Sequence, residues 1–139
     1  MLPLSLTSIG ESAFEDCSSL TQIIIPPSLT SINHYTFYHC ANLKQISFQI
    51  PSSVTSIGNH AFYGCSSLTQ ITIPSSVTSI GNDAFYYCKS LTQVTIPSSV
   101  TSIGDSVFYK CKSLTQVTIP SFINPKKLDI TSRATITTF

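Results

Sequence analysis

Five cysteines recur at almost constant intervals along this chain of 139 residues. Successive members of the set lie 23, 25, 23 and 23 residues apart, at Cys17, Cys40, Cys65, Cys88 and Cys111. A single unit of that length cannot bury its own apolar residues, so the chain must fold as a stack of similar units. The sequence therefore predicts a repeat protein with about five repeats of 23 residues.

The repeats divide the chain near a proline-containing corner at the end of each unit. They span residues 5–27, 28–52, 53–75, 76–98 and 99–121. The second unit carries a two-residue insertion around 47–50, where we expect a bulge or a change of curvature. Residues 1–121 are thus predicted to form a repeat array. Residues 122–139 leave the repeating frame and are predicted to form an irregular cap or tail, in which "ATITTF" adds a last strand.

Each unit contains a strand pattern, seen in the fourth unit as "LTQVTIP" at 91–97. Apolar and polar residues alternate there with a period of two, so Gln93 and Thr95 point away from the core. Pro97 ends the strand because proline has no N–H for a ladder. Equivalent strands of stacked units would form a parallel sheet with a spacing of about 4.7 to 4.9 Å. The inward positions of this unit are predicted to be Val77, Ile80, Ala84, Phe85, Cys88, Leu91, Val94 and Ile96.

A second pattern in each unit predicts a short extended segment followed by a turn. In the fourth unit "VTSIG" ends at Gly81, where a turn with a positive φ angle is expected. Asn82 or Asp83 is then suited to cap one helical turn that runs through Phe85 to Cys88. A single helical turn is unstable in water, so packing against the strands must stabilise it.

The frame L-x-x-[IV]-x-I-P-x-S-V-x-x-I-G-x-x-A-F-x-x-C, as in "LTQITIPSSVTSIGNDAFYYC" at 68–88, resembles the BspA-type leucine-rich repeats. The resemblance covers 5–121 and implies a right-handed leucine-rich repeat solenoid of the α/β class, dominated by strands. It implies a parallel sheet on the concave face and short helical turns on the convex face. Ser76 replaces the Asn or Cys of commoner leucine-rich repeats, so a buried asparagine ladder is not expected.

The same resemblance implies a function in protein binding, without catalysis and without a cofactor. Members of the family are typically cell-surface or secreted proteins associated with adhesion to a host, a matrix or a neighbouring cell. Similar repeats also serve as intracellular docking scaffolds. The opening "MLPLSLTSIG" has no basic segment followed by a long apolar one, as a signal peptide would, so a cytoplasmic scaffold remains the alternative.

Charge and hydropathy narrow the classes of partner. The net charge of +1 is too small for a nucleic-acid surface, and no apolar run reaches the length of a membrane span. A protein ligand is therefore expected, with a glycan as the alternative. Carboxylates gather at the start of the chain and basic residues near its end, a gradient that allows head-to-tail self-association.

The cysteines and histidines are the residues most often involved in chemistry, and each has a simpler structural interpretation. The five cysteines share one repeat position, so they are predicted to be buried free thiols rather than disulfides or metal ligands. His60 and Asp83 occupy equivalent positions in neighbouring units and can form a hydrogen bond. No nucleophile is placed beside them, so a solvated surface pair is a better explanation than a catalytic dyad.

Two regular rows of side chains are the candidate binding surfaces. The first is the outward face of the strands, whose candidate residues are Gln22, Gln45, Gln70, Thr72, Gln93, Thr95, Gln116 and Thr118. The second follows the phenylalanines as an aromatic stripe and consists of Tyr38, Tyr63, Tyr86 and Tyr109. Rows of neutral hydrogen-bonding groups suit a flat contact with a protein or a glycan, whereas stacked tyrosines also shield the edge of a core.

Overall fold

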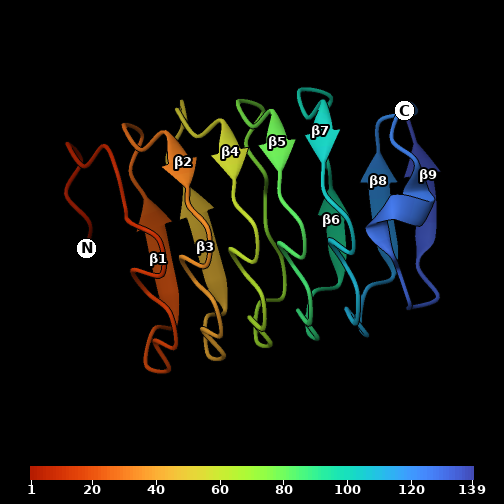
Figure 1. Ribbon diagram of the computed structural model, residues 1–139, viewed down its shortest axis with the longest axis horizontal. Coiled ribbons are helices and arrows are strands. Elements are labelled where there is room, and N and C mark those ends of the chain that lie inside the picture. Colours follow the sequence, from red (N-terminus) through yellow and green to blue (C-terminus); the bar gives the residue numbers. More distant parts are fainter.

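The computed structural model describes residues 1–139 as a solenoid of stacked rungs, one for each repeat, with the two termini at opposite ends (Figure 1). We number the rungs one to five in the order of the repeats. All strand pairs are parallel, as the repeat pattern predicts. The strands are β1 (Gln22–Ile25), β2 (Ser31–Ile32), β3 (Gln45–Phe48), β4 (Ser56–Ile57), β5 (Ser79–Ile80), β6 (Gln93–Thr95), β7 (Ser102–Ile103), β8 (Gln116–Ile119) and β9 (Thr135–Thr138).

The first row of strands forms a surface that we call the strand face, made by β1, β3, residues 70–73, β6, β8 and β9. It is interrupted at rung three. β1 pairs with β3, and β6 pairs with β8 and β9, but Gln70 and Gln93 form only an isolated bridge. Figure 1 accordingly draws no strand of this row between β3 and β6. The bulge expected at the insertion is not found inside β3, which pairs with β1 residue for residue, and the ladder stops after it instead.

The second row of strands is continuous. β2, β4, β5 and β7 form one four-stranded sheet in which serine lies opposite serine and isoleucine opposite isoleucine. Each of these strands has only two residues. The sheet therefore depends on the regular stacking of rungs two to five.

The core runs through the middle of the stack. All eight positions predicted to face inward in rung four are buried, from Val77 to Ile96. The phenylalanines form a column of parallel rings, and the centroids of Phe62 and Phe85 lie 5.3 Å apart. The same stacking continues from Phe85 to Phe108 at 5.6 Å. Each phenylalanine in the middle of the stack is thus covered by a ring on both sides.

The opposite side of each rung, which we call the turn side (residues 10–17, 33–40, 58–65, 81–88 and 104–111), contains tight turns instead of the expected helical turn. Alternate N–H groups have different partners. Those of Asp83, Phe85 and Tyr87 donate to the next rung at 3.0, 3.0 and 2.8 Å, whereas Tyr86 and Cys88 donate within their own rung. A helix would use every N–H internally, so this pattern replaces helical bonds with bonds between rungs. Neither Asn82 nor Asp83 caps a helix.

The prediction of a positive φ angle at Gly81 is wrong. Left-handed backbone occurs later in the same turn, at Asp83 (54°) and Tyr87 (64°), two of the residues whose N–H groups reach the next rung. Gly81 is needed for space instead. A Cβ atom built there would lie 2.6 Å from the backbone nitrogen of Asn59 in the preceding rung.

The segment after rung five continues the stack in spite of its divergent sequence. The 3-10 helix η1 (Pro125–Leu128) lies against the turn side, where the N–H of Phe108 donates to the carbonyl of Leu128 at 3.0 Å. β9 pairs with β8 along its whole length, so the alternating "ATITTF" does add a last strand. No helix in the structure has the length and apolar character needed to cross a membrane.

Candidate functional site

A depression of about 330 Å³ lies on the strand face over rungs three to five. Its floor is apolar and includes Ile71, Ile73 and Val94. Its polar lining consists of six of the eight residues predicted on this face: Gln70, Thr72, Gln93, Thr95, Gln116 and Thr118. The depression begins directly after the break in the strand ladder, because rung three contributes to it the segment 70–73, which pairs with rung four only through the bridge between Gln70 and Gln93.

The polar side chains around this depression have no hydrogen-bond partner within the chain. This is true of the amides of Gln70, Gln93 and Gln116 and of the three lining threonines. Five of the six side chains are exposed, and Thr118 is half-buried. Their donors and acceptors are therefore available to a ligand without breaking a bond in the protein.

Some polar side chains elsewhere on the rungs are used for stacking, whereas Ser56, Ser79 and Ser102 in the second row of strands have no hydrogen-bond partner within the chain. Ser76 and Ser99 each donate to a carbonyl of the preceding rung, at 2.6 and 2.7 Å. Thr92 does the same at 3.2 Å, immediately beside the candidate residue Gln93. The contrast separates side chains that hold the rungs together from those that remain unpaired on the strand face.

An asparagine ladder also joins the rungs, at a position that the sequence reasoning missed. The side-chain oxygen of Asn59 accepts from the N–H of Asn82 at 2.9 Å, and that of Asn82 accepts from Asp105 at 2.9 Å. This ladder lies at the surface, directly after the glycine of each turn. It is distinct from the buried ladder of commoner leucine-rich repeats, whose position Ser76 occupies here. The recurrence of Gly-Asn in rungs three and four was the available signal.

The cysteines are free thiols, and four of the five are buried. Each buried thiol donates to the carbonyl of a phenylalanine in the preceding rung, as Cys88 does to Phe62 at 3.3 Å. Burial raises the pKa of Cys40 to about 11 and that of Cys111 to about 12. These thiols therefore stay protonated and unreactive at neutral pH, as structural core residues do.

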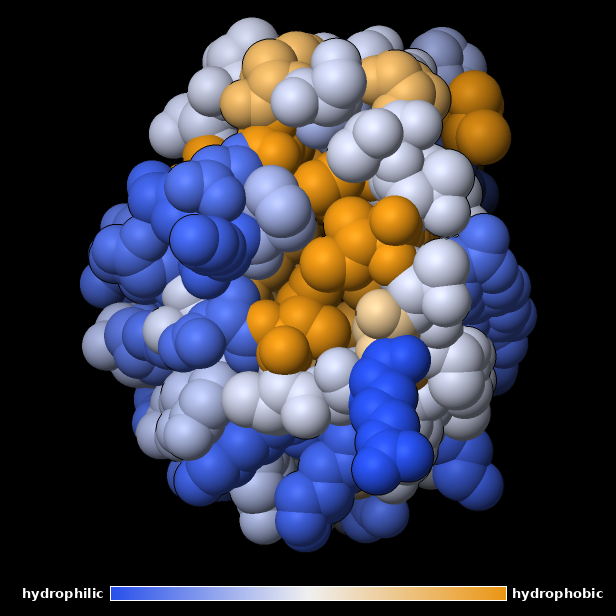
Figure 2. Space-filling model, turned by 90° about the vertical axis from the view of Figure 1, so that its right-hand side faces the viewer, coloured by the Kyte–Doolittle hydropathy of each residue, from blue (hydrophilic) through white to orange (hydrophobic).

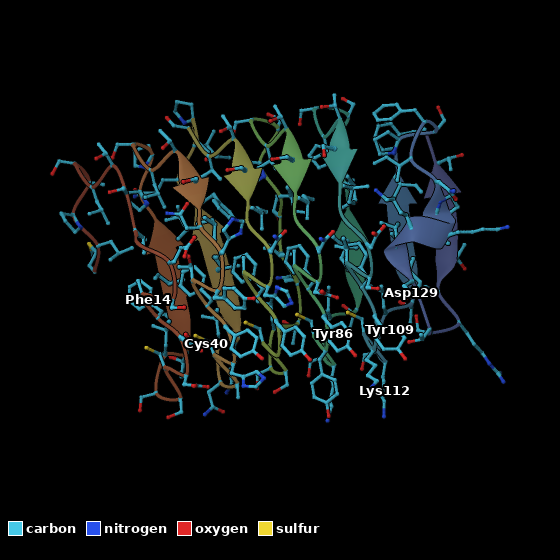
Figure 3. All side chains as sticks on the ribbon, viewed as in Figure 1. Phe14, Cys40, Tyr86, Tyr109, Lys112 and Asp129 are labelled. Carbon is cyan, nitrogen blue, oxygen red and sulfur yellow. The ribbon has the colours of Figure 1, made fainter.

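The tyrosine stripe forms as predicted, with half-buried rings on the turn side. Tyr38 and Tyr63 stack at 4.9 Å, Tyr63 and Tyr86 at 4.6 Å, and Tyr109 follows at 5.0 Å with a tilted ring. Figure 3 shows Tyr86 and Tyr109 side by side on neighbouring rungs. Burial and the neighbouring tyrosines raise the pKa of Tyr63. The rings cover the edge of the phenylalanine column and expose a narrow aromatic strip.

His60 and Asp83 form the predicted pair, with His60 Nε2 3.2 Å from Asp83 Oδ2. The imidazole stacks on the ring of Tyr35 at 4.8 Å. Its other nitrogen, Nδ1, is buried without a hydrogen-bond partner. The pair joins two rungs at a half-buried position on the turn side, away from the depression on the strand face.

The remaining two predicted strand-face residues lie apart from the depression. Gln22 and Gln45 belong to β1 and β3, the block of strands that ends before rung three. Gln22 instead borders a separate cavity at the N-terminal end of the stack, together with Ile24. The exposed Ile24 replaces the hydroxyl residue found at this position in the other rungs. The sequence thus predicted that these glutamines and threonines share one outward row, but not that the strand face is split between β3 and rung three.

Comparisons with known proteins agree with this architecture. The family model described as BspA type leucine-rich repeat region (6 copies) matches residues 1–115 and 46–137. A leucine-rich repeat protein from Bacteroides ovatus is similar over 92% of this chain and 32% of its own, with 30% identity and a TM-score of 0.84. This chain therefore spans about a third of the length of that protein.

Two further solved structures are similar. A leucine-rich repeat protein from T. pallidum matches 96% of this chain and 66% of its own at 29% identity, with a TM-score of 0.79. A leucine-rich cell surface protein from Faecalibacterium prausnitzii matches 96% of this chain and 39% of its own at 35% identity, with a TM-score of 0.76. A search of curated proteins found no match.

Proposed function

Because this chain belongs to the BspA-type leucine-rich repeat family, whose repeats generally bind proteins, we propose that it binds a protein ligand through its strand face. The binding region is the depression over rungs three to five. The protein is non-enzymatic in this proposal, in keeping with what is typical of the family and of the solenoid fold. His60 and Asp83 then serve to join two rungs.

One observation carries this proposal: the six polar side chains that line the depression have no hydrogen-bond partner within the chain. An unused amide or hydroxyl can bond to a ligand without breaking a bond in the protein, and ordering each exposed glutamine costs about 0.5–1.5 kcal/mol in return. The apolar floor of Ile71, Ile73 and Val94 is already almost fully buried, so recognition in this proposal rests on the polar side chains around it.

The absence of charge around the depression defines the kind of ligand surface that fits. None of the ten residues that line it is ionisable. Binding should therefore depend weakly on salt and should favour a neutral polar surface over an acidic or basic one. A glycan carried by the ligand would offer similar hydroxyl groups, so a glycoprotein is the alternative target.

We place the ligand outside the cell and the function in adhesion to a host, a matrix or a neighbouring cell. Support comes from the similar F. prausnitzii structure, which is described as a cell surface protein. An intracellular docking scaffold is the alternative. Labelling of intact cells with a membrane-impermeant reagent separates the two, since the adhesion proposal requires this protein to be labelled.

The direct test compares two sets of glutamine variants for capture of a ligand from surface-protein and matrix extracts. Gln70→Glu, Gln93→Glu and Gln116→Glu together place three charges around the depression and should abolish capture. Gln22→Glu and Gln45→Glu make the same change on the same face outside the depression and should leave it intact. Capture that survives the triple substitution would rule out this site and make the tyrosine stripe the next candidate.

A second measurement separates protein from glycan recognition. The captured ligand is treated with glycosidases and offered again to the wild-type chain. Retention after deglycosylation supports recognition of the polypeptide, and loss would assign the site to a glycan.

A further inference from the structure

A group of basic and aromatic side chains lies at the corner of rungs four and five, where each rung passes from the turn side to its strand. This group, which we call the basic cluster, consists of Lys89, Lys110, Lys112, Tyr86, Tyr87 and Tyr109. Lys89 and Lys112 hold the same repeat position, directly after the cysteine. Their backbones are adjacent, because the N–H of Ser113 donates to the carbonyl of Lys89 at 3.1 Å. Rungs one to three have an uncharged residue at this position.

Two of the three ammonium groups lie against tyrosine rings. Lys89 Nζ is 4.3 Å from the centroid of the Tyr87 ring. Lys110 Nζ lies 5.5 Å from the centroid of Tyr109 and 6.0 Å from that of Tyr86. Lys110 therefore contacts rings from both rungs, which makes the cluster one surface across two repeats.

The positive charges converge on one hydroxyl group. A hydrogen bond from Lys89 lowers the pKa of Tyr87, and the charges of the three lysines lower it further. Figure 3 places Lys112 at the lower edge of the stack, beneath Tyr109. Figure 2 looks along the stack from its C-terminal end, and the same lower edge carries hydrophilic side chains there. The cluster is thus a local positive surface on a chain whose net charge is only +1.

No carboxylate neutralises the basic cluster, since none of its lysines forms an ion pair. Rungs four and five have one carboxylate each, and both have other partners. Asp83 pairs with His60 at 3.2 Å. Asp105 lies 3.7 Å from Lys127 Nζ. The three charges are therefore available to an anion from outside the chain.

The donors of the cluster indicate which kind of anion fits. The backbone N–H groups of Tyr86, Tyr87 and Tyr109 already donate to carbonyls within the chain, at 3.1, 2.8 and 3.2 Å, so an extended peptide cannot pair with them. The remaining donors are ammonium and phenol groups, which suit oxyanions that project from a ligand. Sulfate groups on a sugar project in this way, and the tyrosine rings offer apolar edges to the sugar itself.

We propose that the basic cluster binds a sulfated polysaccharide, with Lys89, Lys110 and Lys112 holding its sulfate groups. This contact is separate from the depression on the strand face, and neither depends on the other. Binding of a polyanion to lysines releases counterions, so it should weaken steeply as salt rises. The neutral depression should respond weakly to salt, which allows the two contacts to be measured separately.

The test measures binding of heparin, a sulfated polysaccharide, to the 139-residue chain by isothermal titration calorimetry. Lys89→Gln with Lys112→Gln removes two charges from the cluster and should weaken binding about tenfold or more. Lys89→Arg with Lys112→Arg keeps the charges and should stay within about threefold of wild type. Circular dichroism and thermal unfolding verify that each variant is folded.

The matched control removes the same charge elsewhere. Lys44 lies directly before β3, and Lys126 lies in η1 beside Ile136. Lys44→Gln with Lys126→Gln should weaken heparin binding by less than about threefold, because these charges are far from the cluster. An equal loss in the two glutamine pairs would overturn the proposal, since heparin would then respond only to net charge. Wild type that does not bind heparin would overturn it as well.

The salt dependence counts the contacts. The slope of the logarithm of the association constant against the logarithm of salt concentration should become shallower by about one for each cluster lysine removed. The control pair should keep the slope of wild type. An unchanged slope in the Lys89 and Lys112 variant would mean that these lysines do not hold sulfate groups.

Three other polyanions test the class of ligand. Desulfated heparin, which keeps its carboxylates, should bind about tenfold more weakly or less. Poly-L-glutamate and a single-stranded DNA oligonucleotide should also bind more weakly than heparin. Binding of either one as tight as that of heparin would assign the cluster to an acidic polypeptide or a nucleic acid and overturn the proposal.

Discussion

The two sides of each rung use the same repeat in opposite ways. On the turn side, backbone N–H groups, thiols and aromatic rings all bond or stack to the neighbouring rung, and the pattern continues without a break through the array. On the strand face the ladder stops at rung three, and the side chains of Gln70 and Thr72 have no partner. Stability is thus concentrated on one side, which leaves the other side available for recognition.

The comparison explains why near-identical repeats can differ in structure. Rungs three and four differ at only four of 23 positions, yet rung four forms β6 and rung three forms an isolated bridge. The difference lies in the neighbours, because rung three follows the insertion in rung two. The turn side passes the same point without interruption, since the N–H of Phe37 donates to Ala61 at 2.9 Å.

The largest effect should come from the phenylalanine column. Phe85→Ala removes a fully buried ring that stacks on both neighbours and should lower the free energy of unfolding by about 3–5 kcal/mol. Phe14→Ala should cost clearly less because that ring is half-exposed at the end of the stack. Urea denaturation of the two variants tests this. Equal losses would mean that the end rung is as well packed as the middle.

Glycine substitutions test the close approach of rungs on the turn side. Gly81→Ala places a Cβ 2.6 Å from a backbone nitrogen and should destabilise by about 1–3 kcal/mol. Gly10 holds the same repeat position as Gly81, but a Cβ added there has nothing within 4 Å. Gly10→Ala is therefore the matched control and should be neutral or slightly stabilising. Thermal unfolding of both proteins gives the comparison. A tolerated Gly81→Ala would contradict the close packing of adjacent turns.

The protein should lose stability at alkaline pH because its thiols are buried. Burial raises the pKa of Cys40 to about 11 and of Cys111 to about 12, so the unfolded state ionises first, near its ordinary pKa of 9.0. Stability is complete below that pH and falls as the pH rises towards the folded values, by about 1.4 kcal/mol per pH unit for each thiol. Urea titrations between pH 8 and pH 11, a range chosen around these pKa values, measure the slope.

Substitution of the two thiols isolates their contribution to the alkaline loss of stability. The Cys40→Ala and Cys111→Ala double variant should be less stable at neutral pH but should show a shallower alkaline slope. An unchanged slope would show that these thiols do not cause the loss. Cys88→Ala should likewise lower stability without removing any disulfide, because all five cysteines are free.

The smallest effect is expected on the strand face. Gln70→Ala and Thr72→Ala remove exposed side chains without an internal partner and should change stability by no more than about 0.5 kcal/mol. Thr92→Ala, one row away, removes a hydrogen bond to rung three and should cost about 0.5–1.5 kcal/mol. Chemical denaturation resolves the difference. A larger loss of unfolding free energy for Gln70→Ala than for Thr92→Ala would mean that the row of Gln70, and not that of Thr92, holds the rungs together.

The sequence predicts those structural features that depend on the residues of a single repeat. Alternation identified the inward residues of rung four and the strand β9, and the equal spacing of cysteines predicted buried thiols. It did not predict the left-handed backbone at Asp83 and Tyr87, because those angles accompany hydrogen bonds to the next rung. Gly81 was assigned to the wrong cause for the same reason: its constraint comes from Asn59, in another repeat.

The candidate site also combines features that one repeat predicts with features that depend on several rungs. Its outward row of glutamines and threonines could be predicted from alternation alone. Its restriction to rungs three to five could not, since the depression depends on how three rungs stack and on the segment 70–73, which forms no regular strand.

Native-state hydrogen exchange, resolved by residue, tests the contrast between the two sides most directly. The amides of Phe62 and Phe85, which donate to the next rung at 2.8 and 3.0 Å, should be among the slowest to exchange. Those of Ile71, Thr72 and Ile73 make no backbone hydrogen bond and should exchange much faster than Val117 in the paired strand β8. Protection at residues 71–73 equal to that of Val117 would contradict the account, because it would mean that the strand face is as continuous as the turn side.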